Sequence, residues 1–243
     1  MTSNSHLRAL RWFAVLCLLV PLVVYGTVAA VRYLQMTDET AVRLQRAQRI
    51  SQEHALKVFD TSDLLLSRVE DALQEAGELA GETFVVGLHE RLRTLAGNRP
   101  SLHSIWIYDQ YGRPVATDRA YPAPDVQVAD RPYFQAHRSG RHPLYIAGPL
   151  LERAEKTPFI SISRGRYAPD GAFRGVISVN VRPEYLTRFH EALAAEEPGA
   201  AITMFREDGG ILSRWPDLGP APAKMSASTP VVTLLEGNTP LLD

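Results

Sequence analysis

The chain of 243 residues holds 26 Lys and Arg against 27 Asp and Glu, which gives a formal net charge of −1 at pH 7. Nothing in this near-neutral balance points to nucleic acid, so a nucleic-acid partner is not expected. The chain has one cysteine, Cys17, and therefore no internal disulfide.

An apolar run without a charged side chain extends from Trp12 to Val31, near the start of the chain. As a helix, about twenty such residues cross the roughly 30 Å hydrocarbon core of a bilayer. We therefore predict a transmembrane anchor at residues 12–34, after a cytoplasmic tail at residues 1–11. A cleaved secretory signal is the alternative, since small residues occur at Thr27–Ala29, but the run is longer than the usual 7–15-residue signal core.

The basic residues beside the run indicate its orientation only weakly, because Arg8 and Arg11 precede it and Arg32 follows it. Short N-terminal tails with a small basic cluster usually remain cytoplasmic. We expect a single-pass protein of the inner (cell) membrane whose main domain is periplasmic or extracellular.

Two helices are predicted after the anchor. No Pro or Gly occurs from Thr37 to Ala76, and apolar residues recur there at three- and four-residue steps, which is typical of an amphipathic helix. Thr37–Thr40 can cap this helix, or the anchor helix runs straight through. A second helix is predicted from Glu82 to Leu95, and Gly97 and Pro100 then end it.

The apolar pattern next changes to the two-residue period of strands. The predicted strands are Ser104–Asp109, Pro114–Thr117, Leu144–Ala147, Phe159–Arg164 and Gly175–Val181, followed by a hairpin of Ala201–Phe205 and Ile211–Arg214. A short helix is predicted from an Asp130 N-cap to His137, and another from Pro183 to Leu193. Val231–Leu235 is a further short apolar piece.

This order of elements predicts an α+β fold, with an N-terminal transmembrane helix and further helices packed on one antiparallel sheet. The last hairpin looks like the start of a second, smaller subdomain, because two strands and a loop cannot bury enough surface to be stable alone. Either this module packs on the first, or the chain is the front part of a longer protein.

Several sequence blocks occur in an order that resembles a known family. They are IWIYDQYGRPVATD (105–118), DRPYFQAHRSG (130–140), LYIAGPL (144–150) and PFISISRGRYAPDGAFRGVISVNV (158–181). Behind an anchor and a long helix, they resemble the double-Cache (PDC, PAS-like) extracytoplasmic sensor domains of bacterial histidine kinases and diguanylate cyclases. The resemblance implies a sensor domain with a PAS-like sheet at residues 37–197 and an incomplete membrane-proximal subdomain at residues 198–243.

The resemblance also implies a ligand site between the sheet and the loop-helix that contains Arg131-Pro132-Tyr133-Phe134. The Arg131 guanidinium can hold a carboxylate by two hydrogen bonds, while the rings of Tyr133 and Phe134 form an apolar wall. The alternative is that Arg131 pairs with Asp130 or Asp118 and that both rings pack in the core.

Alternation along the strands adds further candidates. Ser161 and Ser163 share one face of their strand, and Ser178 and Asn180 share one face of the last strand of the sheet. These four polar residues, together with Tyr145, are predicted to line the ligand site. A solvated sheet face is the alternative interpretation.

Two departures from the family pattern bear on the ligand. Asn180 stands where amino-acid-binding relatives carry an aspartate, and Gly148–Leu151 stands where they carry a Tyr-x-Asp motif. Without these acids an α-amino ligand loses its charge partners. The resemblance then favours a small carboxylate or another polar metabolite over an amino acid. The alternative that the domain binds no ligand is not excluded by these residues.

No enzymatic or metal site is predicted. The seven histidines are scattered without the i, i+4 spacing of metal ligands, and neither a Gly-x-Ser-x-Gly motif nor a phosphate-binding loop occurs. Ser161 and Ser163 have no evident histidine or aspartate partner in the sequence. We therefore expect no catalytic residue and no cofactor.

The sequence thus predicts the ligand-sensing region of a homodimeric membrane receptor, which binds a small polar ligand and signals through its transmembrane helix. A kinase or cyclase output domain is expected outside this sequence. The alternative is an anchored dimerisation or interaction module without a small-molecule ligand. That alternative predicts no enclosed pocket, a salt-bridged Arg131 and a buried Tyr133.

Overall fold

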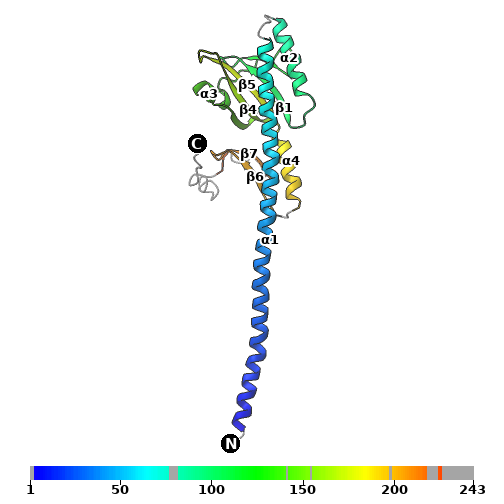
Figure 1. Cartoon of the computed structure of the whole chain (residues 1–243), viewed down its shortest axis with the longest axis vertical. Coiled ribbons are helices and arrows are strands. Elements are labelled where there is room, and N and C mark those ends of the chain that lie inside the picture. Colours follow the sequence, from blue (N-terminus) through cyan, green and yellow to red (C-terminus); the bar gives the residue numbers. More distant parts are fainter. Residues whose placement is uncertain are drawn as a thin grey trace. The chain divides into compact units, whose positions relative to one another are not determined.

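The computed structural model describes residues 3–76, 82–140, 142–153, 155–196, 199–217 and 224–225 (Figure 1). The chain divides into two compact units, Met1–Ile50 and Ser51–Asp243. The predicted apolar piece Val231–Leu235 lies outside the described residues.

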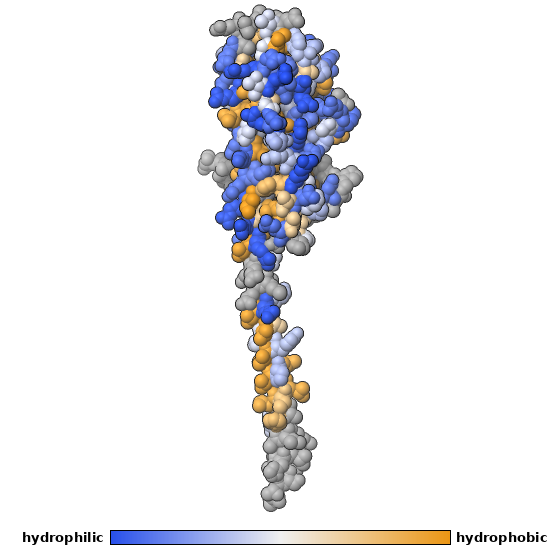
Figure 2. Space-filling model, turned by 90° about the vertical axis from the view of Figure 1, so that its right-hand side faces the viewer, coloured by the Kyte–Doolittle hydropathy of each residue, from blue (hydrophilic) through white to orange (hydrophobic). Residues whose placement is uncertain are grey.

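The described part of the first unit is the N-terminal portion of helix α1 (Ser3–Ala76). Its window Leu16–Tyr33 has a mean hydropathy of 1.8, and none of it is buried, so this helix is long and apolar enough to cross a membrane. Figure 2 shows apolar residues along this window. The helix continues without a break through Thr37–Thr40, which therefore do not begin a new helix.

A five-stranded antiparallel sheet forms the centre of the second unit, with the strand order β2-β1-β5-β4-β3. The strands are β1 (Leu102–Tyr108), β2 (Pro114–Thr117), β3 (Tyr145–Leu151), β4 (Pro158–Tyr167) and β5 (Phe173–Val181). All five correspond to strands predicted from the sequence, and the predicted α+β fold class is confirmed.

Strand β3 continues to Leu151, beyond its predicted end at Ala147. Gly148 and Pro149 favoured a strand end, but the register shifts between Ala147 and Leu150, so that the strand passes these two residues as a bulge. Because β3 is an edge strand, the missing N–H of Pro149 leaves no gap in the sheet. The extension brings Leu151 and the residues after it to the site described below.

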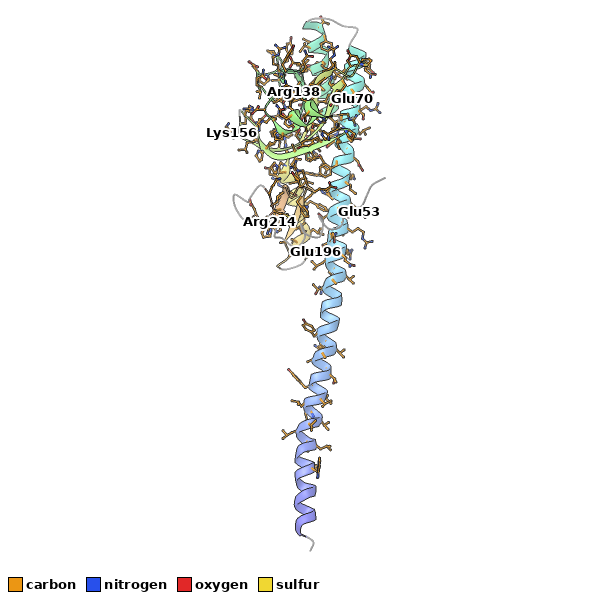
Figure 3. The ribbon with its side chains drawn as sticks, turned by 90° about the vertical axis from the view of Figure 1, so that its left-hand side faces the viewer. Glu53, Glu70, Arg138, Lys156, Glu196 and Arg214 are labelled. Atoms are coloured by element: carbon orange, nitrogen blue, oxygen red, sulfur yellow. The ribbon has the colours of Figure 1, made fainter. Side chains whose placement is uncertain are left out.

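One face of the sheet packs against α1 and α2 (Glu82–Ala96). The apolar residues buried between them include Leu65, Leu66, Val69, Leu88, Leu92, Ile105, Ile107, Ile160, Ile162, Ile177 and Val179. Beside this core, Arg164 of β4 pairs with Asp63 and Glu70 of α1. Glu70 is labelled on α1 in Figure 3.

The opposite face of the sheet packs against α3 (Pro132–Ser139). The cluster buried there consists of Trp106, Tyr108, Val128, Tyr133, Phe134, Ala147, Phe159 and Val176. The N-cap of α3 is Arg131 and not Asp130, so that prediction is wrong. Asp130 forms an ion pair with Arg153 instead, which directs its carboxylate to another partner than the N–H groups of the helix.

Helix α4 (Pro183–Ala194) follows β5 and packs against the hairpin of β6 (Ile202–Phe205) and β7 (Ile211–Trp215). The predicted hairpin is confirmed, with its outer boundaries shifted by one residue. Arg206 Nη1 donates to the carbonyl oxygen of Ile146 on β3 at 2.7 Å. The hairpin therefore packs on the five-stranded sheet and does not stand alone.

Candidate functional site

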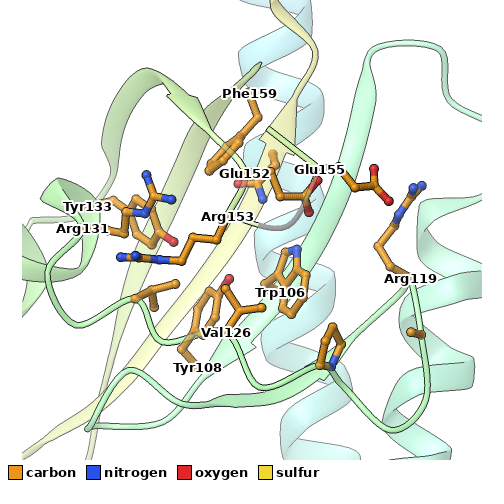
Figure 4. A pocket seen from close by; sticks show the side chains of 14 residues that line it. Trp106, Tyr108, Arg119, Val126, Arg131, Tyr133, Glu152, Arg153, Glu155 and Phe159 are labelled. Atoms are coloured by element: carbon orange, nitrogen blue, oxygen red, sulfur yellow. The ribbon is translucent and has the colours of Figure 1, made fainter. Parts of the chain in front are cut away.

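A cavity of about 230 Å³ lies on the α3 side of the sheet (Figure 4). Its walls come from β1, β4 and β5, from the loop after β2, from the start of α3 and from the residues after β3. The lining residues are Trp106, Tyr108, Arg119, Ala120, Pro124, Val126, Val128, Arg131, Tyr133, Glu152, Arg153, Glu155, Phe159 and Asn180. Apolar walls with a few polar groups are typical of sites for small molecules.

Trp106, Tyr108 and Tyr133 form an aromatic wall of the cavity. The Trp106 and Tyr108 rings stack with their centroids 5.7 Å apart, and the Tyr133 ring lies 6.5 Å from that of Tyr108. Burial raises the pKa of Tyr133 to about 12 and also raises the pKa of Tyr108. Both hydroxyls therefore stay protonated at neutral pH, and this wall carries no charge.

Charged side chains contribute a second part of the lining, and Figure 4 shows them around the aromatic wall: Arg119, Arg131, Glu152, Arg153 and Glu155. Two of them are engaged by neighbours outside the cavity. Arg153 pairs with Asp130, and this contact lowers the pKa of the Asp130 carboxyl. Glu152 Oε2 lies 3.4 Å from Nε2 of the buried His103.

Arg131 is held by the backbone and not by an acid. Its Nη2 donates to the carbonyl oxygen of Leu151 at 2.8 Å. The two acids considered as partners are occupied elsewhere, because Asp130 pairs with Arg153 and Asp118 Oδ1 accepts from the backbone N–H of Ile105 at 2.6 Å. Within the described ranges, Arg131 forms no ion pair. A guanidinium has five N–H groups, so donors remain for a ligand.

A chain of buried polar side chains ends at the cavity. Ser161 Oγ and Ser178 Oγ lie 2.8 Å apart, and Ser178 donates to Asn180 Oδ1 at 2.7 Å. Asn180 Nδ2 and Trp106 Nε1 both donate to Ser104 Oγ, each at 3.0 Å. These groups satisfy one another, as buried polar groups must.

Three of the predicted site residues line the cavity: Arg131, Tyr133 and Asn180. Phe134 instead packs edge-on against Phe173, because consecutive helical residues point about 100° apart and Tyr133 takes the cavity side. The other predicted residues do not line it; they are Tyr145, Ser161, Ser163 and Ser178. The alternative of a solvated sheet face is wrong, since all three serines are fully buried.

Ser163 has a histidine partner that the sequence did not reveal. His137 Nε2 lies 3.0 Å from Ser163 Oγ, and both side chains are fully buried. The Ser163 hydroxyl donates to the carbonyl oxygen of Tyr145 at 3.1 Å, so its single proton is used and His137 Nε2 must be the donor. The hydrogen bond therefore runs opposite to that of a serine activated by a histidine base.

The same pair lacks the other parts of a hydrolytic site. His137 Nδ1 has no hydrogen-bond partner among the described residues, where an orienting acid would bind. Burial lowers the pKa of His137 to about 4. The described part of the chain also brings no three His, Cys, Asp or Glu side chains together as metal ligands.

Sequence reasoning missed most of the cavity. Trp106 and Tyr108 pair across β1 and β5 with Ser178 and Val176, so strand register would have placed them on the face of Asn180. Glu152 and Arg153 were missed because the predicted third strand ended too early. Alternation places Phe159 on the same face as Ser161, but it does not show that Phe159 meets the cavity and Ser161 does not.

No family model matches the chain, and no curated protein matches it. Among solved structures, the extracellular domain of rpHK1S-Z16, a protein assigned as a histidine kinase, is 28% identical with a TM-score of 0.62, over 76% of this chain and 75% of that chain. A domain of a sensory box/GGDEF family protein from Vibrio parahaemolyticus is 16% identical with a TM-score of 0.53, over 82% and 77%.

The sensory domain of the Campylobacter jejuni chemoreceptor Tlp3 with isoleucine bound is 18% identical with a TM-score of 0.45, over 79% of this chain and 82% of that chain. That similarity is too low to indicate a ligand for this chain. By their descriptions, the first two of these structures are an extracellular domain of a histidine kinase and a domain of a sensory box protein.

Proposed function

The second unit has the fold of a Cache-type extracytoplasmic sensor domain, and on this premise we propose that its cavity beside α3 binds a small polar ligand with a carboxylate group. The carboxylate contacts the Arg131 guanidinium, and Tyr133 and Asn180 contact the rest of the ligand. Phe134, Tyr145 and the three serines support these residues from outside the cavity.

This proposal rests mainly on Arg131, whose positive charge faces the cavity without a carboxylate partner among the described residues. It lines the cavity, its position is fixed by a bond to the Leu151 carbonyl, and it forms no ion pair with any described residue. A guanidinium fixed in this way is ready to receive a carboxylate through two parallel hydrogen bonds. The uncharged aromatic wall then encloses the apolar part of the ligand.

The size of the cavity limits the ligand to a small molecule. Its volume of about 230 Å³ is near the lower end of ligand pockets, which measure about 300–1,000 Å³. The alternative of an interaction module without a ligand predicts a filled cleft and a salt-bridged Arg131. The buried Tyr133 agrees with that alternative, whereas Arg131, which binds the Leu151 carbonyl and forms no ion pair with a described residue, does not.

We further propose that ligand binding in the cavity is transmitted to the membrane through helix α1. Helix α1 contains the apolar window Leu16–Tyr33 and also Leu65, Leu66 and Val69, which pack on the sheet. A ligand that shifts the sheet against this helix would change the transmembrane segment in a homodimeric receptor whose sensor domain is periplasmic. The proposed sensor domain covers residues 37–197, and the proposed membrane-proximal subdomain covers residues 198–243.

The test uses the full chain in lipid nanodiscs and a panel of small carboxylates, amines and sugars, measured by calorimetric titration. Arg131→Gln should weaken the binding of a carboxylate by about 10- to 100-fold, since a charge-assisted hydrogen bond contributes about 1.5–3 kcal/mol. Arg138→Gln is the matched control, because Arg138 lies exposed on α3 and does not line the cavity (Figure 3). The proposal fails if no carboxylate binds or if both variants lose affinity equally.

A further inference from the structure

The buried polar chain that passes through Asn180 crosses three strands. Ser161 belongs to β4, Ser178 and Asn180 belong to β5, and Ser104 and Trp106 belong to β1. Each of these side chains is at most 5% exposed. Groups buried this deeply must keep their hydrogen bonds, so their arrangement fixes the orientation of every member.

The direction of each bond in this chain follows from the donors available. The Asn180 Oδ1 atom only accepts, so the hydroxyl proton of Ser178 goes to it. Ser161 must then be the donor to Ser178 Oγ. At the other end, the Trp106 indole only donates, and Ser104 Oγ accepts from both Trp106 and Asn180 Nδ2. In this arrangement Asn180 Oδ1 faces Ser178 and Nδ2 faces Ser104, and the amide uses one N–H and one lone pair.

The buried chain leaves part of the hydrogen-bonding capacity of the Asn180 amide unused. A carboxamide offers two N–H groups and two lone pairs on its oxygen, and the buried chain uses one of each. Asn180 lines the cavity, whereas the only N–H of Trp106 is already donated to Ser104. Asn180 thus brings to this wall one N–H and one oxygen lone pair that the buried chain does not use, and it carries no charge.

Only some chemical groups satisfy such a pair. A carboxylate accepts from the N–H but places its second oxygen against Oδ1, and an ammonium donates to Oδ1 but leaves the N–H without an acceptor. An unsatisfied buried polar group costs more than the bond it lacks would have contributed. A carboxamide or a hydroxyl donates and accepts at once, and it brings no charge into this wall.

We infer that Asn180 is the specificity-determining residue of the cavity and that it selects ligands whose end opposite the carboxylate is an uncharged donor–acceptor group, a carboxamide or a hydroxyl. This rests on the proposed function, because Arg131 supplies the site for the carboxylate. The charged lining residues come from other segments, namely the loop after β2, the start of α3 and the residues after β3.

Three probes of matched length test the inference on the full chain in nanodiscs by calorimetric titration. Succinamate, succinate and 4-aminobutyrate share a carboxylate and two methylene groups and differ in the other end, which is a carboxamide, a carboxylate or an aminomethyl cation. The wild-type chain should bind succinamate at least tenfold more tightly than either of the others. Asn180→Asp should change the ratio of succinamate to 4-aminobutyrate affinity by at least tenfold in favour of 4-aminobutyrate.

Ser161→Ala is the control, since Ser161 belongs to the buried chain but does not line the cavity, and the order of the three ligands should be unchanged. If Asn180→Asp does not fold, the order of the three affinities in the wild-type chain tests the inference by itself. Equal affinities for the three probes, with binding lost in Arg131→Gln, would overturn the inference and leave the proposed function standing. Binding of none of the three and of no other carboxylate overturns both.

Discussion

The guanidinium of Arg164 on β4 lies 2.6 Å from the carboxylate of Glu70 on α1. Its other terminal nitrogen pairs with Asp63, which precedes Glu70 by about two helical turns. Burial alone would lower the pKa of Arg164, but its contacts with Glu70 and Asp63 raise it, so the cation persists at any physiological pH. One arginine therefore fixes two turns of α1 against the sheet.

Arg164→Met should lower the free energy of unfolding by about 1–3 kcal/mol, because two partly buried carboxylates lose their counter-ion. Arg68→Met is the control, since its contact with Asp71 is exposed, and it should change stability by less than about 0.5 kcal/mol. Urea denaturation followed by tryptophan fluorescence measures both. Equal stabilities of the two variants would contradict this role of Arg164.

The burial of His137 makes stability depend on pH. Its pKa is lowered from 6.5 to about 4, so between these values the unfolded chain binds a proton that the folded chain does not. Stability should therefore fall as the pH falls through this window, by up to about 1.4 kcal/mol per pH unit, and level off below pH 4. Above pH 6.5 this contribution is fully present.

The measurement compares the free energy of unfolding of the wild-type chain and His137→Gln at several pH values between 7 and about 4. His54 and His190 also have lowered pKa values and add a slope of the same sign in both proteins, so the difference isolates His137. The variant should show the shallower dependence. Parallel curves would mean that His137 does not resist protonation in the folded chain.

Gly175 is required by the backbone of β1. Its φ is +119°, and an added Cβ would clash with the carbonyl oxygen of Tyr108 and lie 2.7 Å from the carbonyl carbon of Asp109. Gly175→Ala should therefore lower the free energy of unfolding by about 2–5 kcal/mol. Gly87 of α2 has open space around its Cβ position, so Gly87→Ala should raise stability by about 0.5–1 kcal/mol. Thermal unfolding measures the stability of both variants. If Gly87→Ala lost as much stability as Gly175→Ala, the steric explanation would be refuted.

The contact of Arg206 with β3 should slow the hydrogen exchange of the backbone amides in the β6–β7 hairpin. Arg206→Ala removes the bond to the Ile146 carbonyl, so the amides of Ile202–Phe205 and Ile211–Trp215 should exchange about five- to tenfold faster, which corresponds to about 1–1.4 kcal/mol of local opening free energy. Hydrogen–deuterium exchange with mass spectrometry measures this. Amides of β5 serve as the internal reference, and an equal acceleration there would indicate global destabilisation instead.

The sequence predicted the elements of the sheet because their pattern is local. Alternation alone placed Ser161 and Ser163, and Ser178 and Asn180, on single faces of their strands, and the geometry agrees. Alternation does not tell which members of a face meet a cavity. That depends on how α3 and the loops cover the sheet, which is why Asn180 lines the cavity while Ser178 is enclosed.

Side-chain contacts between residues far apart in the chain could not be predicted from the sequence. Ser163 and His137 are 26 residues apart, and nothing in either local pattern indicates their contact. The partner of Asp130 was likewise misjudged, because a local helix cap was favoured over Arg153, which lies 23 residues further along the chain. Electrostatic partners of exposed or half-buried charges are set by the assembled fold, whereas strand periodicity is set by the backbone.

The edge strand β3 carries two contacts that tie different parts of the second unit to it. Its Leu151 carbonyl binds Arg131 at the cavity, and its Ile146 carbonyl binds Arg206, which precedes the turn between β6 and β7. Both contacts are made through backbone atoms of a single strand, at one edge of the sheet. Through these two contacts, a single stretch of backbone at the sheet edge connects the lining of the cavity with the hairpin.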